Sequence, residues 1–269
     1  MAEQTTARSG RHTDTVRFTR RNLVALVIEV GLVAALLLLY REGRTLARSH
    51  VGRAEQNAAW LWHLERSLHL PNEGDLQHWL LTSSTLVHFA DRYYVGVHFP
   101  ITAAFLLWLW FRHHNRYGRV RTTLVITTAL GLLLTVLVPL APPRLFGGDG
   151  LVDTMQVFGP SAYNANTTVG LANQYAAMPS LHIAWSVLVG VTVVLVSTRR
   201  WRWVVLAHPV VTTFVVIATA NHYWSDGLVA VVILGVSAAA VYRPQWFVDP
   251  VRRCVVVVVR RSARVLRRP

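Results

Sequence analysis

The chain has 269 residues, of which 53% are hydrophobic, and combines a formal net charge of +14 with a mean hydropathy of +0.36. Soluble globular domains rarely show this combination, so the composition indicates a membrane protein. All 27 basic residues are arginine and the chain has a single cysteine, which excludes a Walker-type or Schiff-base lysine, an intrachain disulfide and a cysteine-rich metal site.

Six apolar runs predict an all-α, polytopic membrane protein with six transmembrane helices, each near the roughly 20 residues that a bilayer core requires. They lie at 22–40, 86–111, 122–140, 178–197, 203–220 and 223–242. We therefore expect one six-helix domain over 22–243, between a cytoplasmic basic tail at 1–21 and a basic cytoplasmic tail at 244–269. The first tail lacks the apolar core and the cleavage site of a secretory signal, so we expect it to be retained.

The half-polar region 41–85 lies between the first two runs. Trp60, Leu64 and Leu68 recur there at a spacing of four, while Glu65 points to another face. This pattern predicts an interfacial amphipathic helix.

Loop charge predicts the orientation of the chain. The segments 112–121, 199–202 and 260–269 are strongly basic, whereas 141–177 holds one basic residue, Arg144, beside two aspartates. Because positive loops stay in the cytoplasm, we expect both termini there, in contact with anionic lipid headgroups, and the loop 141–177 outside the plasma (cytoplasmic) membrane. The arginines flank apolar runs, so the basic excess reflects membrane orientation and not nucleic acid.

The first unusual cluster is "LVPLAPPRLFGGDG" at 137–150. Its proline pair ends a helix and its glycines allow a turn, which places Arg144 just outside a membrane helix. An arginine that contacts lipid headgroups is the alternative interpretation.

The second cluster is "NQYAAMPSLHIAWS" at 173–186. Pro179 suits the first turn of a helix, whose free N–H groups around Ser180, Leu181 and His182 would point outward and attract an anion. The alternative is an ordinary helix start with a capping serine and an incidental histidine.

The third cluster is "ATANHYWSDGLVAVV" at 218–232. On a helix, His222 and Asp226 lie on one face about 6 Å apart along the axis, so that the carboxylate can orient the imidazole as a base or nucleophile. A buried structural pair is one alternative. A Zn²⁺ site with His182 is another, but the tight spacing of zinc motifs is missing, so we expect no metal and no cofactor.

Together, the three clusters predict an extracytoplasmic site for a phosphate ester whose lipid part stays in the bilayer. "PSLH" at 179–182 and "HYWSD" at 222–226 resemble the second and third signature motifs of the type 2 phosphatidic acid phosphatase superfamily, PSGH and SR-x5-H-x3-D. With "APPR" at 141–144, the motifs are most similar to the branch of inositol-phosphorylceramide synthase-like and sphingomyelin synthase-like phosphotransferases, which has many actinobacterial members. The resemblance covers 86–242 and, more loosely, 54–85.

The resemblance implies a role for each matching residue. His222 would be the nucleophile, Asp226 its orienting partner, and His182 the acid that protonates the leaving oxygen. Two positions that carry a cation in the family hold Leu137 and Val216 here. Phosphate binding would therefore depend on Arg144, Ser180, the backbone at Leu181, and the further candidates Asn173, Gln174, Tyr175 and Tyr223.

The predicted function is an integral membrane lipid-phosphate phosphatase or phosphotransferase that acts through a phosphohistidine on a phospholipid or polyprenyl phosphate. Transfer of a lipid headgroup, of the inositol-phosphate type, to an alcohol is one alternative. A lipid-binding or transport protein whose His/Asp pair relays protons is another.

Further polar residues lie inside the apolar runs, where such residues usually pair or line a substrate path. Asp91, Tyr93, Tyr94 and His98 are candidates for substrate contacts. For His208 we expect a structural role, and Glu29 either pairs or lines the path of the headgroup.

Overall fold

The computed structural model describes Val27, Gly31 and residues 51–147, 150–159 and 175–243. The described residues form helices and no strand, which confirms the predicted all-α class. The predicted first span at 22–40, with Glu29, and the tails at 1–21 and 244–269 lie outside the described residues, apart from Val27 and Gly31.

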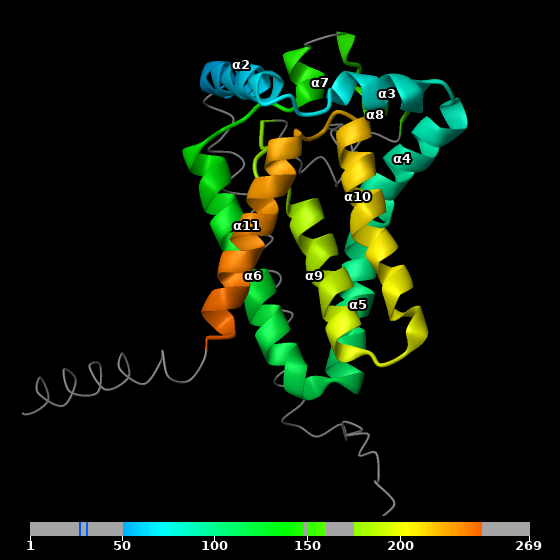
Figure 1. Ribbon diagram of the computed structural model, residues 1–269, viewed down its shortest axis with the longest axis vertical. Helices are drawn as coiled ribbons and strands as arrows, with labels where there is room; N and C mark the ends of the chain where they lie inside the picture. The colour runs from blue at the N-terminus through cyan, green and yellow to red at the C-terminus, as the bar shows by residue number, and fades with distance from the viewer. Residues whose placement is uncertain (1–26, 28–30, 32–50, 148–149, 160–174, 244–269) are drawn as a thin grey trace, which may run out of the picture.

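Most of the described helices form a bundle (Figure 1). Its members are α4 (Ser84–Gly96), α5 (His98–Arg112), α6 (His114–Leu137), α9 (Leu181–Val196), the 3-10 helix η3 (Arg200–Leu206) with α10 (Ala207–Ala218), and α11 (Trp224–Val241). Among the described residues, three helices are long and apolar enough to cross a membrane, namely α6, η3 with α10, and α11. The pair α4 and α5, bent by 46°, makes a fourth if it is one span.

The predicted span at 178–197 is shorter than expected. It forms α9, an apolar helix of 16 residues that begins at Leu181. The described residues thus show a membrane protein with three or four candidate spans, and six spans stay a prediction.

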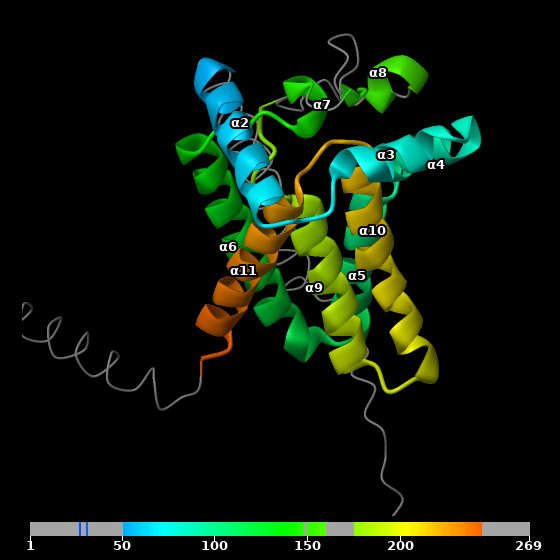
Figure 2. The same ribbon diagram turned by 45° about the horizontal axis from the view of Figure 1, so that its top comes forward.

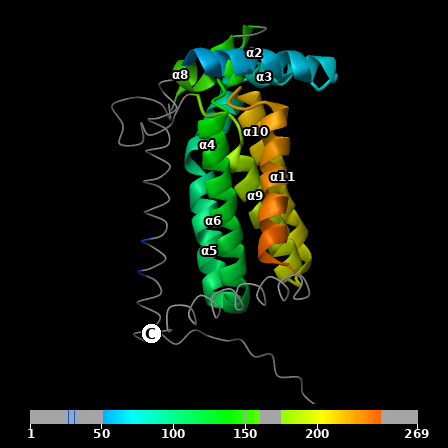
Figure 3. The same cartoon turned by 90° about the vertical axis from the view of Figure 1, so that its left-hand side faces the viewer.

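Four helices gather at one end of this bundle, namely α2 (Val51–Ser67), α3 (Glu73–Leu81), α7 (Pro143–Phe146) and α8 (Thr154–Phe158). Figures 1 and 3 show α2 and α3 lying crosswise over the ends of the vertical helices, and Figure 2 shows the same end turned toward the viewer. Of the predicted apolar stripe, Trp60 is 65% exposed and Leu68, which follows α2, is 61% exposed, while Leu64 packs against the core. A helix therefore exists where an amphipathic one was predicted, and its place at a membrane interface stays a prediction.

At the centre of the bundle, α9 contacts α5, α6, α10 and α11. Two glycines let its first turns approach the neighbouring helices closely. A Cβ atom on Gly131 of α6 would lie 2.8 Å from Leu181 Cδ2, and one on Gly227 of α11 would lie 2.8 Å from Ile183 Cδ1. Helices in membranes associate through such close packing at small residues. The start of α9, which carries the second cluster, is therefore held tightly between α6 and α11.

Candidate active site

A sharp turn between α10 and α11 presents His222. The N–H groups of Asn221 and His222 both donate to the carbonyl oxygen of Val216, at 3.0 and 3.1 Å. Ala220 adopts a φ of 52°, a left-handed conformation that is uncommon for residues other than glycine. The chain thereby reverses just before α11 begins at Trp224.

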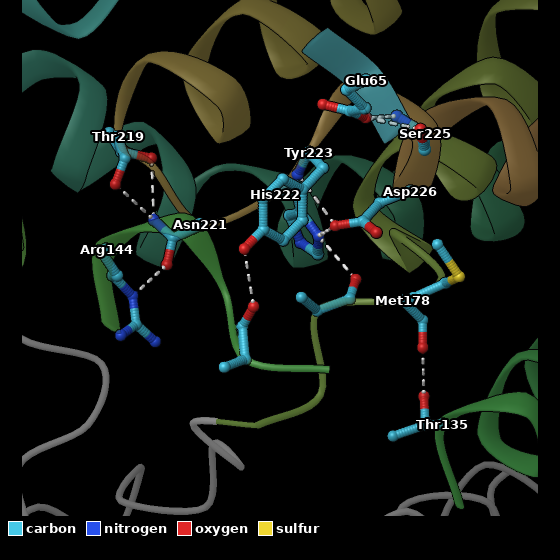
Figure 4. A network of polar contacts seen from close by, with 12 residues as sticks. Glu65, Thr135, Arg144, Met178, Thr219, Asn221, His222, Tyr223, Ser225 and Asp226 are labelled. Carbon is cyan, nitrogen blue, oxygen red and sulfur yellow. Dashed lines mark hydrogen bonds and ion pairs between the residues drawn. The ribbon is translucent and has the colours of Figure 1, made fainter. Parts of the chain in front are cut away.

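His222 and Asp226 form the predicted pair (Figure 4). The Nδ1 atom of His222 lies 3.2 Å from Asp226 Oδ2 and 2.8 Å from the carbonyl oxygen of Ala177. A carbonyl and a carboxylate oxygen both accept, so the proton is assigned to Nδ1 and the lone pair to Nε2. Asp226 Oδ2 also accepts from the N–H of Tyr223 at 2.9 Å, which fixes the carboxylate. In the neutral form of His222 the free lone pair is therefore on Nε2.

The second cluster meets this pair at the start of α9. Ser180 is the N-cap residue of α9. Pro179 therefore precedes the helix, whereas the sequence predicted it in the first helical turn. The N–H of Ser180 donates to the backbone oxygen of Asp226 at 3.3 Å, which joins α9 to α11. Within the described part of the chain, the N–H groups of Leu181 and His182 have no acceptor, as in any first helical turn. Free donors of this kind at a helix start can bind an anion.

His182 lies near His222, with 6.4 Å between the ring centroids. Its other face is covered by Tyr94, which stacks at 4.5 Å, and by His98 at 4.6 Å. Two of the residues proposed for substrate contacts therefore lie directly against His182. They can set its orientation.

Arg144 approaches the same turn from α7. Its backbone N–H donates to the carbonyl oxygen of Ala220 at 2.9 Å, and its Nε donates to Asn221 Oδ1 at 2.9 Å. The guanidinium also forms an ion pair with Asp153 at 3.3 Å. Pro143 starts this short helix and Gly147, with a φ of 69°, ends it. The structure thus brings the predicted arginine beside the residue that precedes His222.

Other predicted binding residues lie apart from these groups or outside the described residues. Tyr223 is fully buried, and its hydroxyl donates to the carbonyl oxygen of Ala141 at 3.1 Å. The hydroxyl of Tyr223 thus serves the backbone of the neighbouring segment. The backbone oxygen of Tyr175 accepts from Leu140, while Asn173 and Gln174 lie outside the described residues.

Leu137 and Val216 stand at the two positions where the family carries a cation. Leu137 is 63% exposed at the end of α6, and Val216 is buried in the core. Neither position therefore brings a charge to the site.

The remaining polar residues of the apolar runs connect helices. The hydroxyl of Tyr93 lies 2.7 Å from His208 Nδ1, as expected for a structural role of His208. Asp91 accepts from Thr154 at 2.8 Å and ties α4 to α8. Among the described residues, no group of three or more His, Cys, Asp or Glu side chains could hold a metal ion.

The sequence analysis missed two buried carboxyl groups. Glu65 of α2 and Glu73 of α3 are both fully buried, and Glu65 contacts the start of α11. No periodic pattern in the sequence around Glu65 predicts that its side chain is buried. Only the crossing of α2 over α11 reveals it.

A family model described as the PAP2 superfamily matches residues 59–240, well over half of the chain. The chain belongs to the PAP2 superfamily. The matched segment contains Arg144, His182, His222 and Asp226. Members of the PAP2 superfamily are phosphatases or phosphotransferases that act on phosphorylated lipids, which assigns this chain to the same class of enzyme. No curated protein and no solved structure matches the chain.

Proposed function

We propose that this PAP2 protein cleaves or transfers a phosphate ester of a membrane lipid through a phosphohistidine at His222, at the outer face of the plasma membrane and without a metal. The observation that carries the proposal is the environment of His222 Nδ1. Its two neighbours, the Ala177 carbonyl and the Asp226 carboxylate, both accept, which leaves Nε2 as the nucleophilic nitrogen.

The first step forms the covalent intermediate. Nε2 of His222 attacks phosphorus, and the bond between phosphorus and the oxygen of the leaving group breaks. His182, in its protonated form, donates a proton to that oxygen. Asp226 stabilises the positive charge that develops on the His222 ring, as the aspartate of a serine-protease triad does.

The second step releases the phosphoryl group. His182, now neutral, removes a proton from water or from an alcohol, whose oxygen attacks the phosphohistidine. The bond between phosphorus and His222 breaks, and the imidazole is restored. Water gives hydrolysis, and an alcohol gives transfer.

Two sets of donors support binding of the phosphoryl oxygens. The free N–H groups at Leu181 and His182 add the positive end of the α9 dipole. Arg144 supplies a guanidinium that Asn221 and Asp153 hold beside the turn. Donors fixed in this way need no rearrangement when negative charge develops in the transition state.

Charge at the opposite end of the bundle supports the outward orientation. The basic segments 112–121 and 199–202 fall at the α5–α6 junction and between α9 and η3. Figures 1 and 3 show both connections at the end opposite to α2 and α7. If the basic end faces the cytoplasm, the site faces outward.

An apolar pocket supports a lipid substrate. A hollow of about 430 Å³ is lined by Leu76, Pro209, Val210, Thr213, Phe214 and Trp224. Trp224 lies two residues after His222 in the chain. The hollow offers an apolar place for part of a hydrocarbon chain.

A panel of lipid phosphates, assayed with purified protein in the presence and absence of an acceptor such as inositol, tests the proposal. We expect release of phosphate or a transferred headgroup, abolished by His222→Ala and unaffected by chelators. Products identified by mass separate hydrolysis from transfer. No turnover of any member of the panel would contradict an enzyme and favour lipid binding or transport. Loss of activity in chelator, restored by Zn²⁺, would contradict the metal-free mechanism.

A further inference from the structure

Three charged side chains meet where α2 crosses the start of α11. Glu65 and Glu73 are fully buried, and Arg66 bridges them, with its Nη2 atom 2.9 Å from Glu73 Oε2 and 3.8 Å from Glu65 Oε2. Buried carboxyl groups are costly unless they are paired and hydrogen-bonded. This cluster lies outside the candidate spans, and the chemistry described above does not use it.

Glu65 binds the first turn of α11. Its Oε1 accepts from the backbone N–H of Ser225 at 2.7 Å and from the Ser225 hydroxyl at 2.5 Å (Figure 4). Ser225 is the second residue of α11, whose N–H has no partner inside the helix. A carboxylate at this position also favours the positive end of the helix dipole. Glu65 therefore caps α11 from another helix.

The capped turn is the one that carries the His222–Asp226 pair. Ser225 directly precedes Asp226, whose carboxylate binds both His222 Nδ1 and the N–H of Tyr223. A shift of the first turn of α11 would move the carboxylate away from the imidazole. Such a shift changes the distance that orients the nucleophile.

A proton shared with Glu73 completes the cluster. If both groups were ionised, Glu65 Oε2 and Glu73 Oε1 would have no hydrogen-bond partner among the described residues. Burial and the hydrogen bond between the two carboxyl groups raise the pKa of Glu73 to about 8. Glu73 is thus protonated at neutral pH and can donate to Glu65, whose Oε1 accepts from Ser225.

We propose that Glu65 is a positioning residue, which holds the first turn of α11 and so keeps Asp226 against His222, while Glu73 donates the hydrogen bond that keeps the Glu65 carboxylate in place. The inference rests on the proposed function, because it assigns Glu65 to the same reaction. Glu65 and Glu73 thereby connect α2 and α3 to the turn between α10 and α11 that presents His222.

The groups that face Glu73 set its pH dependence. They are Glu65 and Arg66 from α2, and Tyr223, the residue before α11. Asp226 from the first turn of α11 faces Glu65. As the pH rises through about 8, Glu73 loses its proton, and a second negative charge develops beside Glu65. The two carboxylates then repel each other, and the cap on Ser225 weakens.

The first test compares three variants of the full-length protein in detergent. Glu65→Ala should lower kcat by about 10- to 100-fold with KM changed little, because positioning and not binding is lost. Glu65→Gln, whose amide oxygen still accepts from Ser225, should recover most of kcat. Glu55→Ala, which removes an exposed carboxylate from the same helix, is the matched control and should behave as the wild type.

The second test uses the pH profile of kcat between pH 6 and pH 10. The wild type should lose activity as the pH rises through about 8, and Glu73→Gln should lack this loss, because its amide donates to Glu65 at any pH. Coincident profiles of the two proteins would overturn the proposal. So would an unchanged kcat in Glu65→Ala, or a kcat in Glu65→Gln as low as in Glu65→Ala.

Folding and the proposed function are separated from this inference by two measurements. The midpoint of thermal unfolding shows whether each variant is folded, and where Glu65→Ala is not, the profile of Glu73→Gln decides alone. An inactive wild type would refute the proposed function itself. If the wild type is active and Glu65→Ala has the same kcat, only the inference is refuted.

Discussion

His222 Nδ1 is closer to the carbonyl oxygen of Ala177, at 2.8 Å, than to the carboxylate of Asp226, at 3.2 Å. The segment before α9 therefore helps to orient the imidazole of His222, which precedes α11. Two acceptors, one of them a neutral backbone group, fix the same tautomer. The second and third sequence clusters are thus joined by a hydrogen bond and do not merely lie near each other.

Asp226→Asn tests how this orientation is shared. In a serine-protease triad the corresponding change costs about 10⁴ in kcat, because the histidine adopts the wrong tautomer. Here Ala177 still accepts from Nδ1, so we expect a smaller loss of kcat/KM, of about 10- to 1,000-fold. A loss as large as the protease value would show that Ala177 does not hold the tautomer, and no loss would remove Asp226 from the mechanism.

His182→Ala tests the division of labour between the histidines. A nucleophile and a leaving-group acid fail differently, since a good leaving group departs without a proton. The variant should keep measurable turnover of an activated aryl phosphate and lose far more with an alkyl or prenyl phosphate. Initial rates on matched aryl and alkyl substrates check this. Equal losses on both substrates would contradict the role of His182 as the acid.

Gly227→Ala tests the close approach of α11 to α9. Its Cβ would lie 2.8 Å from Ile183 Cδ1, and overpacking of this kind costs about 1–3 kcal/mol. We expect a lower thermal midpoint, by on the order of 5 °C, together with reduced activity. Gly235→Ala, on the same helix with no atom within 4 Å, is the matched control and should not lower the midpoint. Equal midpoints for the two variants would contradict the tight packing.

The helical class and the contact between His222 and Asp226 could be predicted from sequence because apolar runs and an i, i+4 spacing are local patterns. The role of Glu65 could not, since its burial depends on where α2 crosses α11. The break between α4 and α5 was also missed, because both halves are apolar and nothing in their composition marks a 46° bend. The hydrogen bond from the Tyr223 hydroxyl to the carbonyl oxygen of Ala141 joins segments far apart in the chain, so no local pattern predicts it.

Cysteine labelling tests the orientation, in a background with Cys254→Ser. The outer position is the exposed Gln156 of α8. Gln156→Cys should react with a membrane-impermeant thiol reagent in intact cells. Asn115→Cys, at the basic end of the bundle, should react only after permeabilisation. The reverse pattern would place the chemistry on the cytoplasmic side.

The central claim is that His222 carries the phosphoryl group, and trapping of the covalent intermediate tests it most directly. Purified protein is mixed with radiolabelled substrate and quenched rapidly in alkaline denaturant. We predict label on the wild type that is stable to base and released by acid, located on the peptide that contains His222, and no label on His222→Ala. Label on His182 instead, or substantial turnover by His222→Ala, would contradict the account.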